Sequence, residues 1–536
     1  MRWVLAPALS VTVPLMMSLA ATPVACWSGE SGVAGTSGAS AKNPHFAIRE
    51  YRVLGNTVLP MREVETLLYG LLGVDKSLDD VESARAALEK IYRDRGYGTV
   101  FVDIPPQSVT DGIVRLRVIE GRVNQTTIGG ARYFREGEIL AQLPEAKPGT
   151  IPNIGTLQQQ LTDVNAQNSD RTVIPVLKAG PVSGTVDMTL KVDDHLPLHG
   201  SVELNNEYTP DTSPLRATVA LSYSNLFADL DTLSAQYQLA PQQPSQVGVV
   251  AVNYAEHPLF GAWRPSIYFI NSNSAVSTIG TLNVLGKGQI AGVRMADTVA
   301  SDSTSVQVLT LGADYKHFRQ SVNLETGLAL NTPISYVNLS VAYDGSWRSD
   351  HYLASANASA NFGPRGLANS PAAFENDRFA ARSNYFYARG SGSVTWLLPA
   401  QWQLTGRLGG QYTREPVISN ENFSIAGFDG VRGYLEAEAL GDSALKGTVQ
   451  LQTPPLHRHG YNLADAYVFL DAAHANVLAA LPGEPQQFTL RSRGVGLDLL
   501  PGRAVSGSLI WAVPLVAGSR TRSHDGRYLF VVRGSF

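Results

Sequence analysis

Apolar and polar residues alternate along most of the chain from about residue 200 to Phe536. Such a period of two predicts β-strands with one apolar face and one polar face. Each run is about as long as the 9–11 residues that a tilted strand needs to cross a membrane. Roughly sixteen runs occur, which lies within the range of membrane barrels. They centre near residues 204, 220, 236, 250, 268, 291, 310, 340, 357, 390, 407, 448, 470, 492, 509 and 531.

The alternation also predicts what each face of the sheet contacts. Because lipid satisfies no backbone hydrogen bonds, a sheet inside a membrane has to close on itself. The apolar face then meets hydrocarbon, and the face rich in Gln, Asn, Ser, Lys and Arg lines a wet lumen. The sequence therefore predicts a transmembrane antiparallel β-barrel of about 16 strands over residues 200–536. The alternative is a large soluble β-sandwich or propeller, which would need a dry core where this chain has a consistently polar face.

Composition favours a barrel over a bundle of membrane helices. Charged residues make up 16% of the chain, and there are 49 glycines. The mean hydropathy is close to zero. Few charges without high hydropathy suit strands whose polar and apolar residues average out. The formal net charge of −4 gives no indication of a nucleic-acid partner.

A different pattern, which mixes helices and strands, occurs twice between residues 46 and 193. The first pass predicts a strand at 46–54, helices around residues 64–71 and 79–91, and strands at 98–104 and 113–119. The second pass predicts helices at 136–143 and 154–164 and strands at 172–177 and 185–192. This weak internal repeat predicts two related α+β modules, 46–121 and 122–193. The alternative is a pair of unrelated α+β domains.

The first 25 residues have the features of a signal peptide. A positive start precedes the nearly apolar run Val4–Leu19. Ser18-Leu19-Ala20 has the small-x-small form of a cleavage site, and cleavage near Ala25 is the alternative. Residues 26–45 are rich in Gly, Ser and Ala, which predicts a linker. The single cysteine, Cys26, excludes an internal disulfide.

A glycine-rich segment, 414–442, separates the predicted eleventh and twelfth strands and contains the sequence FDGVRGYLEA. It is too long for a plain hairpin, and loops of such length are usually functional. Its glycines permit tight turns, so that the loop can fold back into the lumen. We expect it to start on the cell surface, because odd-numbered strands run outward from the modules.

Arg432, inside this loop, would need a partner in the lumen. Phe469 and Asp471 point inward from the predicted thirteenth strand, and Asp471 is the carboxylate in the interior of that run. An arginine–carboxylate pair can be bidentate and geometrically specific. In a water-filled lumen it would contribute on the order of 1 kcal/mol, which suits a latch that can release. The alternative is that Arg432 is a solvated loop residue and Asp471 only lines the lumen.

Several of these motifs resemble those of known families. The segments YRVLGNT from Tyr51, RGY from Arg95 and VIEG from Val118 resemble a polypeptide-transport-associated (POTRA) domain. The loop residues are similar to the sixth-loop signature of the Omp85 superfamily; they are Val431, Arg432, Gly433 and Tyr434. Phe469 and Asp471 resemble the partner motif Phe-x-Asp-x-Gly, with Ala473 in place of the glycine. The closing stripe of Tyr528, Phe530 and Phe536 resembles the signal for barrel insertion into the outer membrane, unless the last aromatic is a coincidence.

Together, two POTRA-like modules and about sixteen strands resemble the outer-membrane translocators of two-partner secretion, the TpsB-type ShlB/FhaC/HecB-like haemolysin secretion/activation proteins. The resemblance implies α+β POTRA modules in the periplasm and a barrel in the outer membrane of a Gram-negative bacterium. It implies a large secreted exoprotein bound through the POTRA domains, contact with outer-membrane lipid, and the barrel assembly machinery during biogenesis. A monomer is expected. The segment 32–42 is a poor helix former, which puts in doubt the plug helix that this family often carries.

The sequence shows no motif for an enzyme. It contains no phosphate-binding loop, so transport is expected to proceed without nucleotide hydrolysis. No catalytic, cofactor or metal site is expected. Two other functions stay open: an Omp85-type factor that assembles outer-membrane proteins, and a passive porin.

Overall fold

The computed structural model describes residues 45–536, except 228–229, 259–260, 275, 280–281, 320, 324–328, 332, 368–369, 459–460 and 501–503. The predicted signal peptide and nearly all of the predicted linker lie outside these residues. The chain divides into two compact units between His195 and Leu196. Within the described part of the chain, no helix is both long and apolar enough to cross a membrane.

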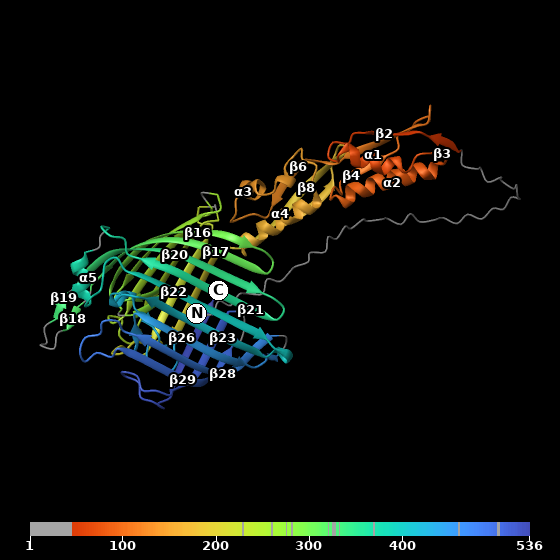
Figure 1. Cartoon of the computed structure of the whole chain (residues 1–536). Helices are drawn as coiled ribbons and strands as arrows, with labels where there is room; N and C mark the ends of the chain where they lie inside the picture. Colours follow the sequence, from red (N-terminus) through yellow and green to blue (C-terminus); the bar gives the residue numbers. More distant parts are fainter. Residues whose placement is uncertain are drawn as a thin grey trace. The chain divides into compact units, whose positions relative to one another are not determined.

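The first unit consists of two α/β modules, drawn in red to amber in Figure 1. The first module contains β1 (Phe46–Ile48), β2 (Glu50–Leu54), α1 (Met61–Tyr69), β3 (Gly73–Lys76), α2 (Leu78–Asp94), β4 (Val100–Asp103) and β5 (Ile113–Glu120). The second contains β6 (Arg122–Gly129), α3 (Glu136–Ala141), the 3-10 turn η1 (Pro144–Ala146), α4 (Ile154–Gln167), β7 (Arg171–Ala179) and β8 (Thr185–Asp194). The helices and strands predicted from the sequence are present. The sequence pattern missed the short β3, which pairs with β1, and the whole of β6.

The two modules have the same sheet topology. Their sheets have the orders β2-β5-β4 and β6-β8-β7. In each sheet the first strand pairs in parallel with the last, and the last pairs antiparallel with the strand before it. This common topology gives the weak sequence repeat a structural basis.

The modules are joined by direct contacts at the end of α2. Gly96 has a φ of +90°, a conformation that glycine adopts readily. Its carbonyl oxygen accepts a hydrogen bond from the backbone N–H of Ile154 at 2.8 Å. The side-chain amide of Asn153 donates to the carbonyl oxygen of Arg95, also at 2.8 Å. Ile151 of the second module is buried in the hydrophobic core of the first.

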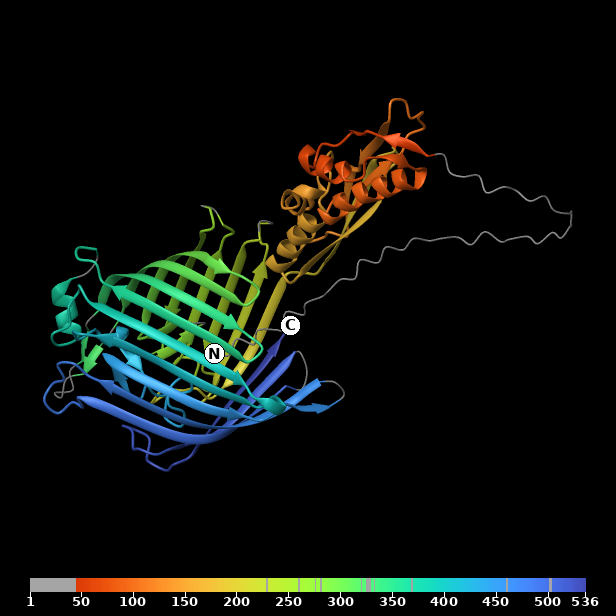
Figure 2. The ribbon, with the colours of Figure 1, turned by 45° about the vertical axis from the view of Figure 1, so that its right-hand side comes forward.

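The second unit is a closed antiparallel barrel of sixteen strands, seen in Figures 1 and 2 in yellow-green to blue. Its strands are β9 (Leu198–Asn205), β10 (Arg216–Ser224), β11 (Thr232–Leu239), β12 (Gly248–Ala255), β13 (Arg264–Ser272), β16 (Gly288–Ser301), β17 (Ser305–Phe318), β20 (Ile334–Arg348), β21 (Tyr352–Phe362), β22 (Phe386–Leu397), β23 (Gln403–Thr413), β26 (Ser443–Gln452), β28 (Tyr461–Asn476), β29 (Gln487–Leu499), β30 (Val505–Pro514) and β31 (Arg527–Ser535). The short β27 (Leu456–Arg458) continues the edge of β26 along β28. Each run of alternation predicted from the sequence coincides with one of these strands.

The barrel closes where its last strand meets its first. β31 pairs with β9 from Val531 opposite Asn205 to Ser535 opposite Ser201. Phe536 and Gly200 then exchange backbone hydrogen bonds of 3.0 and 3.1 Å. No edge of the barrel is left open along this seam, as a barrel in lipid requires.

Connections at the two ends of the barrel differ in size. We call the end where β9 begins the near end. Counted along the chain from β9 as the first barrel strand, the connections after the first, third and each further odd strand lie at the far end. Far-end connections carry β14 (Val276–Ile279) with β15 (Leu282–Leu285), β18 (Ser321–Asn323) with β19 (Ala329–Asn331), α5 (Pro371–Asp377), η3 (Ser419–Glu421), and β24 (Phe423–Ser424) with β25 (Leu440–Gly441). The near end carries the single 3-10 turn η2 (Pro399–Gln401) within the described residues. Between β17 and β20, the β18–β19 hairpin forms a small sheet that is not part of the barrel.

The two faces of the barrel wall separate as the alternation predicts. On β28, Val468 and Leu470 are exposed on the outside, whereas Phe469 and Asp471 are buried inside. The polar inner face, however, is interrupted at the far end by a dry cluster. Its largest members are Phe318, Tyr336 and Tyr387 of the wall, Tyr385 directly before β22, and Phe374 of α5.

The expectation of a polar inner face throughout is therefore wrong at this end. Alternation reports which face a residue occupies, but it does not report whether water or another segment covers that face. Here far-end connections cover it: Phe374 of α5 and Val417 and Ile418 of the segment 414–442 all belong to the cluster.

Candidate functional site

The segment 414–442, here called the lumen loop, forms a compact hairpin between β23 and β26. Its two arms pair through β24 and β25. At the tip, the backbone N–H of Val431 donates to the carbonyl oxygen of Ile425 at 2.9 Å. Gly427 has a φ of +108°, and a Cβ at this position would collide with the carboxylate of Glu436. The tip is thus a defined turn, which a glycine at this position makes feasible.

The structure brings Arg432 and Asp471 together. The guanidinium donates from Nε to Oδ2 at 2.9 Å and from Nη2 to Oδ1 at 2.8 Å. The backbone N–H of Arg432 also donates to Oδ2, at 3.1 Å. The guanidinium carbon lies 3.4 Å from the centre of the Phe469 ring, which places a cation over an aromatic face. The pair is bidentate, and such a pair is geometrically specific.

Side chains of the neighbouring strands complete the shell around this pair. Thr448 of β26 donates to Asp471 at 2.9 Å, and Ser492 of β29 does so at 3.4 Å. Nη1 of Arg432 lies 3.3 Å from the amide oxygen of Gln450. Strands β26, β28 and β29 thus position one carboxylate for one loop arginine.

The surroundings of the pair are dry. The side chains of Arg432 and Asp471 are 6% and 0% exposed. The expected contribution of about 1 kcal/mol, which assumed a water-filled lumen, does not apply here. Removing one partner of a buried pair instead leaves an uncompensated charge and costs about 3–5 kcal/mol.

The remaining motif residues of the loop pack beside the pair. Val431 and Tyr434 are buried in a cluster that also contains Ile425 and Ala473. The hydroxyl of Tyr434 is 2.6 Å from the carbonyl oxygen of Val516. Gly433 has a φ of +98°, which favours glycine there. The methyl group of Ala473 takes part in this packing, so the replacement of the family's glycine is accommodated under the loop.

Glu421 forms a second buried contact between the lumen loop and the barrel wall. Its carboxylate accepts hydrogen bonds from Lys316 of β17 and Tyr387 of β22, both at 2.6 Å. Tyr336 of β20 also donates to it. The backbone carbonyl of Glu421 accepts from Arg389 at 2.9 Å. These partners come from the part of the wall that does not hold Arg432.

Arg378 and Asp442 form a third buried contact, which joins three far-end connections. The guanidinium of Arg378, at the end of α5, reaches both oxygens of Asp442 at 2.6 Å. Asp442 also accepts from the backbone N–H groups of Val417 at 2.9 Å and Leu478 at 2.7 Å. Asp442 is completely buried. The segments 363–385, 414–442 and 477–486 therefore meet at one carboxylate.

Sequence reasoning missed Glu421, Arg378 and Asp442. Arg378 and Asp442 lie 64 positions apart, and neither stands in a strand whose alternation would orient it. The length of the segments 363–385 and 414–442 could have indicated that they contain functional residues, since long connections in compact folds are usually functional.

Two residues of the proposed insertion signal, Tyr528 and Phe530, lie on the closing strand β31, and Phe536 directly follows it. Tyr528 and Phe536 are exposed on the outer face, and Phe530 is half-buried. A Cβ added to Gly200 would collide with the ring of Phe536, so this ring lies directly over the first strand. The aromatic stripe is therefore part of the seam between β31 and β9.

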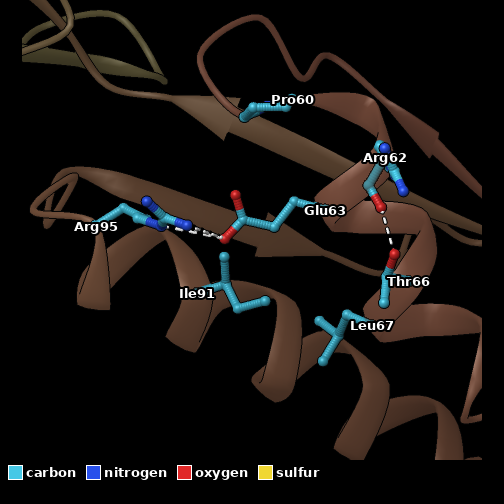
Figure 3. Close-up of a pocket in the computed structure, with 7 residues that line it drawn as sticks. All are labelled: Pro60, Arg62, Glu63, Thr66, Leu67, Ile91 and Arg95. Carbon is cyan, nitrogen blue, oxygen red and sulfur yellow. Dashed lines mark hydrogen bonds and ion pairs between the residues drawn. The ribbon is translucent and has the colours of Figure 1, made fainter.

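The first module carries a pocket between α1 and α2, shown in Figure 3. It has a volume of about 540 Å³ and is lined by Pro60, Leu67 and Ile91 together with polar side chains. Arg95 lies across it and donates to Oε1 of Glu63 from Nε at 3.1 Å and from Nη2 at 2.8 Å.

Both three-stranded sheets of the α/β unit have open edges. Among the described residues, β2, β4, β6 and β7 each pair on one side only within their sheets. An open edge offers N–H and C=O groups to an extended peptide.

Family models match both units of the chain. Residues 46–121 match the POTRA domain, ShlB-type. Residues 184–497, more than half of the chain, match the haemolysin secretion/activation protein ShlB/FhaC/HecB.

Relatives and solved structures agree with these matches. The outer membrane transporter CdiB of Dickeya dadantii (strain 3937) is 22% identical over 414 residues, which cover 75% of this chain and 71% of the relative. The heme/hemopexin transporter protein HuxB of Haemophilus influenzae is 21% identical over 422 residues, covering 74% and 70%. The structure of CdiB from Escherichia coli has a TM-score of 0.58 at 17% identity, covering 94% of this chain and 93% of that one. BamA from Haemophilus ducreyi lacking POTRA domains 1–3 has a TM-score of 0.57 at 15% identity, covering 92% and 100%. At these identities the two structures show a shared fold.

Proposed function

This chain belongs to the haemolysin secretion/activation protein family ShlB/FhaC/HecB, and from that premise we propose that it is the pore through which one large partner exoprotein is secreted. It is an outer-membrane protein of the TpsB transporter type, with its POTRA-bearing part in the periplasm. The near end of the barrel is therefore periplasmic, and the far end faces the cell exterior. The observation that carries the proposal is the lumen loop, which is held inside a closed barrel by Arg432 and Asp471.

The exoprotein would first be captured in the periplasm. An unfolded chain can add a strand to the open edge of β2, β4, β6 or β7, because backbone pairing does not depend on its sequence. The pocket beside Arg95 offers an apolar floor for side chains of such a segment. Capture would thus combine backbone pairing, which suits any extended chain, with a preference for segments that place apolar side chains in this pocket.

The captured chain would then pass through the lumen past the lumen loop. We expect the pair of Arg432 and Asp471 to act as a latch that holds the loop in its resting position. Folding of the exoprotein outside the cell would supply the driving force, without nucleotide hydrolysis.

Deletion of residues 46–193 tests the proposed pore. A candidate exoprotein, sought among the neighbouring genes, would be co-expressed with the deletion variant, and its amount in the medium would be measured. We expect export to be lost while the barrel still inserts, as shown by its heat-modifiable mobility on a gel. Unchanged export would overturn the proposal and favour a passive pore.

The same strain distinguishes a role in assembly. If the levels of many other outer-membrane proteins fall together with the exoprotein, the chain is an assembly factor. If the exoprotein alone is affected, it is a dedicated secretion pore.

The closing aromatic stripe supports a further part of the proposal. We expect the barrel assembly machinery to read Tyr528, Phe530 and Phe536 during insertion. Removal of Phe536 should lower the amount of folded barrel in the membrane, with a full-length Phe536→Tyr variant as the control. The inserted protein is expected to be a monomer in detergent, which light scattering would check.

A further inference from the structure

A groove lies on the outer face of the barrel across β26, β28, β29 and β30. Its volume is about 760 Å³. Its floor is apolar and is formed mainly by Val449, Val468, Leu470, Val495, Trp511 and Val513. The alternation that places Asp471 inside places these side chains outside, where they meet lipid.

Two basic residues border this apolar floor. Arg493 of β29 and His524 of the segment 515–526 both line the groove. Arg493 is paired with Leu470 on one side and Val513 on the other, so it shares their outward direction. Ser492, between Arg491 and Arg493, points inward to Asp471, and this fixes both arginines on the lipid side.

The two arginines are exposed. Within the described part of the chain, neither guanidinium has a hydrogen bond or ion pair. A lipid-facing arginine costs roughly 2–4 kcal/mol at the membrane midplane and about 0–1 kcal/mol near the interface. Their level along the barrel therefore decides whether the membrane can accommodate them.

The two arginines lie where the apolar outer surface of the barrel ends on its far side. Arg493 stands opposite the last but one residue of β30, and Arg491 extends past its end, where its carbonyl accepts from Leu515 at 2.8 Å. Toward the far end, the outward positions on β28 are His474 and Asn476. Toward the near end, β29 continues with outward apolar residues from Val495. Because the far end faces the cell exterior, the arginines lie at the headgroup level of the outer leaflet.

We propose that Arg491 and Arg493 bind the phosphate groups of a phosphorylated glycolipid of the outer leaflet, one acyl chain of which lies in the groove. The Cα atoms of residues two apart on one strand are about 6–7 Å apart along it, so the two side chains can reach two phosphates or make two contacts to one. Arginine pairs with phosphate through a fork of two hydrogen bonds. Trp511 at the floor is typical of side chains that sit at a membrane interface. The site lies outside the lumen, so it does not rest on the proposed secretion function.

Binding of a purified glycolipid to the full-length protein tests this site. The protein in detergent would be incubated with lipid A, and retained lipid would be counted by native mass spectrometry. The variant carrying Arg491→Gln and Arg493→Gln should retain at least about tenfold less lipid A than the unmodified chain, because it lacks both charge-assisted contacts. A matched control carries Arg520→Gln and Arg522→Gln, which remove two arginines at the same end but outside the groove; it should retain lipid A normally.

Further measurements distinguish the contribution of the headgroup from that of the acyl chain, and binding of a glycolipid from binding of a phospholipid. Dephosphorylated lipid A should bind weakly to the unmodified chain. Val495→Trp fills the groove while keeping both arginines, and it should also lower the amount of lipid A retained. Because it leaves the arginines unchanged, it tests the groove even if the double variant fails to fold. Equal retention by the double variant would overturn the site. Retention of phosphatidylglycerol as strong as that of lipid A would overturn the glycolipid assignment.

Discussion

Two buried arginine–aspartate pairs hold the lumen loop, and they do so in different ways. Arg432 is a loop residue that reaches a carboxylate of the wall, Asp471, whose other partners are wall side chains. Arg378 comes from a different far-end connection. Its partner Asp442, at the end of the lumen loop, also accepts from Val417 of the same loop and from Leu478 of a third connection. The first pair fixes the loop to the barrel, whereas the second ties connections to one another. We therefore expect the first to govern the position of the loop in the lumen and the second to govern closure of the far end.

Arg432→Ala should have the largest effect. It leaves the Asp471 carboxylate buried and unpaired, which costs about 3–5 kcal/mol. We expect strongly reduced export and a lower unfolding midpoint of the barrel in detergent. Arg432→Lys keeps the positive charge but loses the planar guanidinium, so its export should lie between that of the unmodified chain and that of Arg432→Ala. Export at the normal level from an inserted Arg432→Ala barrel would remove the latch from the mechanism.

Arg378→Ala should open the far end of the barrel without releasing the lumen loop from the barrel wall. We expect a higher resting conductance in planar lipid bilayers, with export largely kept. Arg382→Ala is the matched control, because the ion pair of Arg382 with Glu415 is exposed, and exposed pairs contribute about 0–1 kcal/mol. If both variants conduct alike, the far-end pair does not control closure.

Double variants sharpen the comparison. Arg432→Ala and Asp471→Ala remove two sides of one contact, so their effects on unfolding should be non-additive by roughly 0.5–3 kcal/mol. Arg432→Ala and Arg378→Ala share no partner, and their effects should add within about 0.5 kcal/mol. Strong coupling in the second cycle would show that the two pairs form a single unit.

Ala473→Gly should have the smallest effect. The change restores the glycine of the family's strand motif beneath the loop. It removes a buried methyl group and introduces a flexible residue into β28, so we expect a loss of about 0.5–1 kcal/mol in the free energy of unfolding. Chemical denaturation of the refolded barrel would measure it. A gain in stability would mean that the alanine is strained there.

Local periodicity was sufficient for the barrel. The outward Leu470 and the inward Asp471 follow from strict alternation, and in lipid the backbone permits only a closed sheet. The position of Arg432 opposite Asp471 came from combining this alternation with the resemblance of the loop motif. In the α/β unit β6 was missed because its pattern, buried at Val123 but largely polar after it, does not alternate clearly.

The sequence by itself determined about how many barrel strands there are and which way each wall residue points, because alternation depends on neighbours one or two positions apart. The candidate pair of Arg432 and Asp471 needed, in addition, the resemblance of the loop motif. The tertiary structure alone decided that this pair is dry, that Glu421 meets Lys316, and that Arg378 finds Asp442. Alternation specifies which face a side chain occupies. It carries no information on which distant segment will cover that face, and burial against such segments sets the strength of a charged pair.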